Sequence, residues 1–176
     1  MLTTPDRNIA PADPEVTSVC ALPPQALDTL LAPYGLLISE VPDGAEIPGS
    51  YWGEREAGLI GNILYLRADT PVHSALHEAC HFICMDEARR TALHTDAKGD
   101  DIEEVGVCYL QALLATRLDG FSQAQLFTDM DAWGYTFLLG SAQAWFERDA
   151  GDGRAWLLRH GLIDNDDVPQ VVTRPG

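Results

Sequence analysis

The sequence predicts a small α+β domain, and three observations support this prediction. Its 176 residues suffice for one domain with a hydrophobic core, but not comfortably for two. A short apolar segment with strand character, residues 57–67 (AGLIGNILYLR), precedes two long segments with helical spacing, residues 71–90 and 101–118. The chain from there to about residue 162 has the pattern of two or three further helices. We therefore expect a short sheet packed on the two long helices, with a helical C-terminal part.

The segments before the apolar strand are shorter. Residues 1–22 are rich in proline, aspartate and threonine and predict a loose N-terminal arm. Residues 23–31 predict a helix opened by proline, and residues 35–41 predict a short strand. Within residues 57–67, Gly61-Asn62 allows a bulge or a tight turn. We expect a single domain over residues 23–165, followed by an irregular tail over residues 166–176.

The first long helix has a clear start signal, Asp69-Thr70-Pro71. Thr70 is expected to cap the free N–H groups, and Pro71 has the fixed φ that suits the first helical position. The helix is expected to run to about Arg90, with Arg89 and Arg90 near its negative end. The second long helix, residues 101–118, is expected to end before Gly120.

Charge and composition narrow the partners and the location. The formal net charge of −16 disfavours direct binding to nucleic acid and to anionic membranes. No apolar run has the length of a membrane span, and the first residues do not resemble a signal peptide, so we expect a cytoplasmic protein. In that compartment the cysteines are expected to be reduced thiols or metal ligands rather than disulfides; they are Cys20, Cys80, Cys84 and Cys108.

Residues 76–84 (LHEACHFIC) carry the motif with the most specific chemistry. On a helix, positions i and i+4 differ by only about 40° in direction, so His77 and His81 point the same way. Two imidazoles one turn apart can bind one zinc ion, and Glu78 then lies where a general base can activate water. The motif therefore predicts a zinc site with His77 and His81 as ligands and Glu78 as the catalytic base.

Catalytic zinc usually has three protein ligands, and the acidic start of the second long helix can supply the third. Glu103 stands at the head of an apolar stripe that would face the core and the first helix, so we prefer it as the ligand. Glu104 is the alternative, although its side of the helix is less apolar. The stripe behind Glu103 consists of Gly106, Leu110, Leu113 and Leu114, whereas Glu104 shares its face with Val107, Cys108 and Gln111.

With these residues in place, the chain resembles the minimal zincin metallopeptidases, and within them the ImmA/IrrE-like group. The resemblance covers about residues 57–115 and includes the helix that follows the HExxH motif. The spacing of that helix fits Glu103, Gly106, Tyr109, Leu113 and Leu114. It departs at Val107, where the group commonly has Asn or Asp to support a ligand histidine. The resemblance implies a zincin-like fold, bound zinc, and hydrolysis of a peptide or protein substrate.

Two other interpretations of the motif stay open. The chain could be a catalytically silent zinc-binding regulatory or scaffold protein, since a domain of this size has little sequence left to build a substrate cleft. Alternatively, Cys84 or Cys108 could complete a closed, structural zinc site with the two histidines. These interpretations predict different effects of substitutions at Glu78 and at the cysteines.

Overall fold

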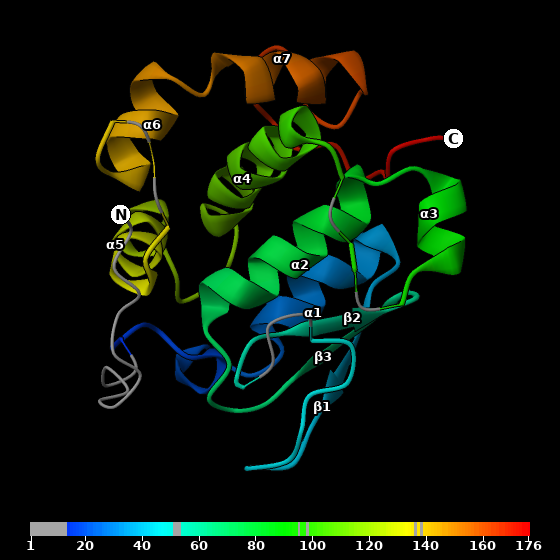
Figure 1. The fold of residues 1–176 in the computed structure, drawn as a ribbon, viewed down its shortest axis with the longest axis vertical. Helices are drawn as coiled ribbons and strands as arrows, with labels where there is room; N and C mark the ends of the chain where they lie inside the picture. The colour runs from blue at the N-terminus through cyan, green and yellow to red at the C-terminus, as the bar shows by residue number, and fades with distance from the viewer. Residues whose placement is uncertain (1–13, 51–53, 95, 98, 136, 138) are drawn as a thin grey trace, which may run out of the picture.

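The computed structural model describes residues 14–50, 54–94, 96–97, 99–135, 137 and 139–176 (Figure 1). Its sheet contains the strands β1 (Leu37–Glu40), β2 (Gly58–Ile60) and β3 (Ile63–Leu66) in the order β1-β3-β2. β1 is parallel to β3, and β2 is antiparallel to it. The predicted segment 57–67 is therefore a hairpin, and its turn includes Gly61 at a φ of 58°, a conformation that favours glycine.

Helices make up most of the rest of the described chain, and the α+β class is confirmed. Two short 3₁₀ turns, η1 and η2, flank the first helix. The helical elements are η1 (Val19–Ala21), α1 (Ala26–Leu31), η2 (Ala32–Tyr34), α2 (Val72–Cys84), α3 (Glu87–Ala92), α4 (Asp101–Ala115), α5 (Gln123–Trp133), α6 (Ala142–Arg148) and α7 (Gly151–Arg159).

The helix α2 is the centre of the molecule. It packs on β2 and β3 on one side and on α4 and α5 on others, so that it lies between the sheet and the helical part (Figure 1). Every residue of α2 is buried except His77 and Glu78, which are half-buried. A helix buried on nearly every side holds its side chains in fixed directions, and the two partly open positions mark where this helix can meet a ligand.

Two glycines let α7 approach α4 closely. A Cβ atom on Gly106 would lie 2.7 Å from the ring of Trp156, and one on Gly153 would lie 2.6 Å from the carbonyl oxygen of Val105. Any side chain at either position would force the two helices apart. This close contact supports α4 on the side that faces away from α2.

The predicted first long helix, residues 71–90, is wrong beyond Cys84. The helix α2 ends at Cys84, and Met85 is extended with a ψ of 153°. A new helix, α3, starts because the Asp86 side chain accepts a hydrogen bond from the backbone N–H of Arg89 at 2.9 Å. Arg89 therefore lies on α3, not near the end of α2.

The predicted cap of that helix is also wrong. The hydroxyl oxygen of Thr70 accepts a hydrogen bond from the backbone N–H of Arg67 at 2.9 Å and so closes the turn before the helix. Pro71 stands at the N-cap position and provides no side-chain hydrogen bond. The start signal therefore identifies the place of the helix but not the role of each residue in it.

Both ends of the described chain are attached to the domain. In the segment expected to be a loose arm, the N–H of Thr17 donates to Asp129 at 3.1 Å, and its carbonyl oxygen accepts from Val72 at 2.9 Å. The first thirteen residues of that arm lie outside the described part. The tail, residues 166–176, runs beside the ends of α2 and α3 and is fixed there through Arg174 (Figure 1). Among the described residues, no helix is long and apolar enough to cross a membrane.

Candidate metal centre

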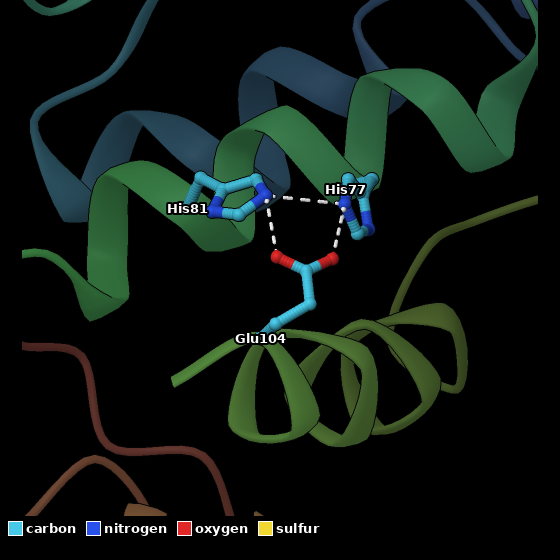
Figure 2. A group of neighbouring side chains, drawn as sticks. All are labelled: His77, His81 and Glu104. Atoms are coloured by element: carbon cyan, nitrogen blue, oxygen red, sulfur yellow. Dashed lines mark hydrogen bonds and ion pairs between the residues drawn. The ribbon is translucent and has the colours of Figure 1, made fainter. Parts of the chain in front are cut away.

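Three side chains from two helices meet at one point (Figure 2). The Nε2 atoms of His77 and His81, one turn apart on α2, lie 3.1 Å from each other. Glu104, from the first turn of α4, places Oε1 3.1 Å from Nε2 of His77 and Oε2 3.2 Å from Nε2 of His81. All of the ligand atoms lie within 4.8 Å of one another. Two imidazoles and a carboxylate therefore converge from opposite sides of the gap between α2 and α4.

This arrangement fits a zinc ion. Zinc takes nitrogen and oxygen ligands at about 2.0–2.2 Å, so two ligands of a tetrahedral ion lie roughly 3.3 Å apart. The separation of 3.1 Å between the two histidine nitrogens agrees with that spacing, and each of these nitrogens has one Glu104 oxygen at a similar distance, 3.1 or 3.2 Å. Moreover, Oε2 of Glu104 is buried, and it lies 3.2 Å from Nε2 of His81. A buried carboxylate oxygen is costly unless a cation or a hydrogen-bond donor balances it.

The protonation equilibria of the cluster also suit a cation. Burial is the largest influence on the pKa of Glu104 and raises it, but the hydrogen bonds and charges of His77 and His81 outweigh burial and hold the pKa well below its usual value. Burial likewise lowers the pKa of His77, and Tyr135, Cys108 and Glu104 outweigh it and raise that pKa well above its usual value. Glu104 is therefore ionised, as a ligand must be, and the imidazole of His77 lies in a field that favours positive charge.

The structure brings Glu104, and not the preferred Glu103, to the histidines. Glu103 is buried, at 3% exposure, as expected from its place at the head of the apolar stripe. Its carboxylate, however, accepts hydrogen bonds from Arg89 at 2.9 and 2.8 Å and from Arg174 at 3.2 Å. The preferred assignment of Glu103 as the third ligand is therefore wrong, and Glu104 takes its place in the cluster. Apolar spacing predicts which residue is buried, but not which group balances its charge.

Gln111 supports His77 from behind. Its Oε1 accepts a hydrogen bond from Nδ1 of His77 at 3.1 Å, and its Nε2 donates to the backbone oxygen of His73 at 2.8 Å. The second bond fixes the orientation of the amide, so Nδ1 of His77 carries a proton toward Oε1 of Gln111, and Nε2 is the ring nitrogen that faces Glu104. Gln111 is fully buried and lies three residues, about one helical turn, after Cys108 on α4. It supplies the support that the resemblance places at Val107.

We expect the Gln111→Leu variant to bind zinc about 10- to 100-fold more weakly, because His77 loses the group that fixes its tautomer and ring orientation. A competition titration with a zinc-binding dye measures the change. Gln123→Leu is the matched control, since its Nε2 also donates to an α4 carbonyl, that of Ala112, at 3.0 Å. Equal affinities for the two variants would contradict a role of Gln111 at the site.

A cleft of about 1010 Å³ opens beside the cluster. His77, Glu78 and Glu104 lie along it, and aromatic side chains from the α5–α6 region form much of the remaining wall. Those aromatic residues are Trp133, Tyr135, Phe137 and Trp145. Burial raises the pKa of Glu78; His77 and His81 oppose this effect, and the charge of Glu56 adds to it. A carboxylate with a raised pKa beside a metal site is suited to accept and return a proton.

The cysteines do not belong to the cluster. The only described group of side chains with metal-binding geometry consists of the two histidines and Glu104. Cys80 and Cys84 are fully buried, and burial raises the pKa of both thiols, so that they stay protonated. Cys108 lies along the cleft wall.

His73 extends the histidine row of α2 by one turn but has a different environment. It is only 1% exposed, and its ring packs against Trp133 and Tyr135 at centroid distances of 5.1 and 5.6 Å. Neither ring nitrogen forms a hydrogen bond with the described residues. Burial, with smaller contributions from His77 and Arg55, lowers its pKa to about 3. His73 is therefore a neutral part of the aromatic wall.

This burial predicts a pH dependence of stability. The unfolded chain binds a proton at His73 as the pH falls below about 6.5, whereas the folded protein does so only near pH 3. The free energy of unfolding should therefore fall on acidification over this interval, by at most about 1.4 kcal/mol per pH unit from this residue. Urea denaturation of metal-free protein at several pH values measures the slope. The slope should be smaller in His73→Phe, and an unchanged slope would contradict this assignment.

The sequence analysis identified the two histidine ligands on α2, but it assigned no role at the site to Gln111 or Tyr135. Gln111 follows Glu104 by seven residues, two helical turns, and this spacing places both on one face of α4. This spacing was the sequence signal that could have indicated the role of Gln111. Tyr135 approaches His77 at a ring-centroid distance of 6.0 Å, and burial raises its pKa to about 12, so its hydroxyl stays protonated. Nothing in the sequence near residue 135 indicates this placement, which depends on how α5 packs against α2.

Comparison with known proteins assigns this chain to no family and gives it no function. The chain matches no protein-family model, no curated protein and no solved structure. The function must be argued from the site itself.

Proposed function

We propose that this protein is a zinc-dependent metallohydrolase that cleaves peptide bonds, with a zincin-like arrangement of its site. One observation carries the proposal: His77, His81 and Glu104 converge with the spacing of zinc ligands, and Glu78 lies along the same cleft. Three protein ligands leave a position for water, which is typical of catalytic rather than structural zinc. The absence of cysteine from the described cluster favours the same interpretation.

Each residue then has a definite role. His77, His81 and Glu104 hold the ion, and Gln111 keeps His77 in the tautomer that exposes Nε2. A zinc ion held there would supply Lewis-acid polarisation of the substrate carbonyl and would lower the pKa of water to about 7. Glu78 accepts a proton from the attacking water and delivers it to the departing amine. Tyr135, protonated at neutral pH, can donate a hydrogen bond into the cleft.

The decisive first experiment is elemental analysis of the purified protein, followed by an assay with a peptide library. About one zinc per chain and cleavage that stops on chelation and returns with zinc would support the proposal. Zinc without cleavage would favour the catalytically silent regulatory or scaffold protein. A chain that takes up no zinc even when zinc is supplied would rule out both.

The chemistry of the cleft favours a class of peptide. Besides Glu78 and Glu104, the lining contains the carboxylates of Glu56 and Asp149, and no lysine or arginine is among the described lining residues. The Glu56 carboxylate accepts a hydrogen bond from Nε1 of Trp133 at 2.9 Å, which joins the acidic and aromatic parts of the wall. Basic side chains and bulky apolar side chains complement such a surface.

We expect peptides with lysine or arginine beside an aromatic residue to have a kcat/KM at least about tenfold higher than matched peptides with glutamate instead. Paired fluorogenic peptides that differ only at the charged positions measure the ratio. The preference should decrease as salt is added, because salt screens the carboxylates. Equal cleavage of both peptides at low salt would contradict the proposed substrate class.

A further inference from the structure

Adjacent glutamates at the start of α4 have opposite surroundings. Successive helical residues point about 100° apart, so Glu103 and Glu104 cannot face the same neighbour. Glu104 faces the histidines, and Glu103 faces the C-terminal end of α2, where Arg89 binds both of its carboxylate oxygens. The Glu103 carboxylate also packs on Gly99, where an added Cβ would lie 2.3 Å from its carboxyl carbon. Glu103 is thus held tightly in a closed pocket.

The C-terminal tail completes this pocket through Arg174. The Arg174 guanidinium donates to Glu103 at 3.2 Å, and its charge lies over the ring of Trp156 at 5.3 Å. Its backbone N–H donates to the carbonyl of Ile83 at 2.8 Å, and its own carbonyl accepts from Arg90 at 2.7 Å. One residue of the tail therefore links the end of α2, the start of α4 and the face of α7.

We propose that Arg174, together with Arg89, is a positioning residue for the metal site. This inference rests on the proposed zinc site. The first turn of a helix has free N–H groups and frays readily, yet here it carries a metal ligand. The backbone N–H of Glu103 is capped by Asp100 at 2.9 Å, and the two arginines fix its side chain. By holding Glu103, they fix the rotation of this turn and so direct Glu104 toward the histidines.

The geometry needs such support because a metal ligand must be held within about 0.5 Å of its productive position. Loss of the Arg174 side chain leaves Glu103 with one guanidinium, while the backbone hydrogen bonds of residue 174 to Ile83 and Arg90 remain. The first turn of α4 then samples orientations in which Glu104 does not meet the histidines. Zinc binding must overcome this added freedom, so its affinity falls although no ligand has changed.

The test compares zinc affinity in Arg174→Ala and Arg154→Ala by competition titration. Each variant removes one positive charge and one attachment of the tail, since Arg154 binds Asp167 at 2.6 Å. We expect about a tenfold loss of zinc affinity in Arg174→Ala, wild-type affinity in Arg154→Ala, and partial recovery in Arg174→Lys. Thermal melting of the metal-free proteins measures stability separately, since a merely structural role would lower the melting temperature without changing zinc affinity.

Wild-type zinc affinity in folded Arg174→Ala would overturn the inference, and so would an equal loss in Arg154→Ala. If Arg174→Ala does not fold, Glu103→Gln replaces it, because it keeps the shape of the side chain and weakens the same pairs. Loss of zinc affinity there supports the inference, and wild-type affinity overturns it. The proposed zinc site fails separately: in that case wild-type protein binds no zinc and Glu104→Gln changes nothing.

Discussion

We expect Glu104→Gln to lower zinc affinity at least about 100-fold, the largest effect of any single carboxylate in the chain. Loss of a supporting residue costs 10- to 100-fold in metal affinity, and loss of a ligand exceeds this. The amide keeps the shape of the side chain but lacks the negative charge that lies 3.1 Å from His77 and 3.2 Å from His81. Competition titration and elemental analysis after dialysis measure the loss.

Two matched variants make this prediction specific to position 104. Asp101→Asn removes the same charge from the same helical turn, but the side chain is exposed, and zinc affinity should be unchanged. Glu103→Gln should weaken zinc binding only about tenfold, because Glu103 acts through its arginines rather than on the ion. A larger loss in Glu103→Gln than in Glu104→Gln would exchange the roles of the two residues and contradict the structure.

The second large effect is expected in Glu78→Gln, which should keep zinc and lose activity by at least about 100-fold. General bases contribute about 10²–10⁴-fold, and Gln cannot accept the proton of the attacking water. Glu78 is not among the three side chains that converge as ligands, so zinc content should equal that of the wild type. The cleavage rate of a fluorogenic peptide, with zinc content measured on the same sample, tests both parts.

Glu56→Gln is the control for this variant. It removes a neighbouring carboxylate from the same cleft, while the amide oxygen can still accept the hydrogen bond from Trp133. Its activity on an uncharged peptide should stay within a few-fold of wild type. Full activity in Glu78→Gln would exclude Glu78 as the base. Zinc loss in that variant would instead make Glu78 part of the ligand set.

The sequence by itself determined the local features of this protein. Periodicity and turn residues predict the strand character of residues 57–67, the helix that carries the motif and the long helix after it, because such signals act over a few neighbouring residues. They left a bulge or a tight turn open at Gly61, where the structure has the turn of a hairpin. The spacing of His77 and His81 likewise fixes their common direction on α2, since helical geometry alone sets it. The break at Met85 was missed because Asp86 can cap a new helix as well as continue an old one.

Only the tertiary structure decided which acidic residue meets the histidines. Glu103 and Glu104 are chemically identical neighbours, and the apolar stripe correctly indicates that Glu103 is buried. Its partners are Arg89, which lies on the separate helix α3, and Arg174, more than seventy residues away in the chain. A buried carboxylate is satisfied by whichever cation the fold brings to it, and long-range packing sets that choice. Glu103 is paired with the two arginines, and Glu104 meets the two histidines.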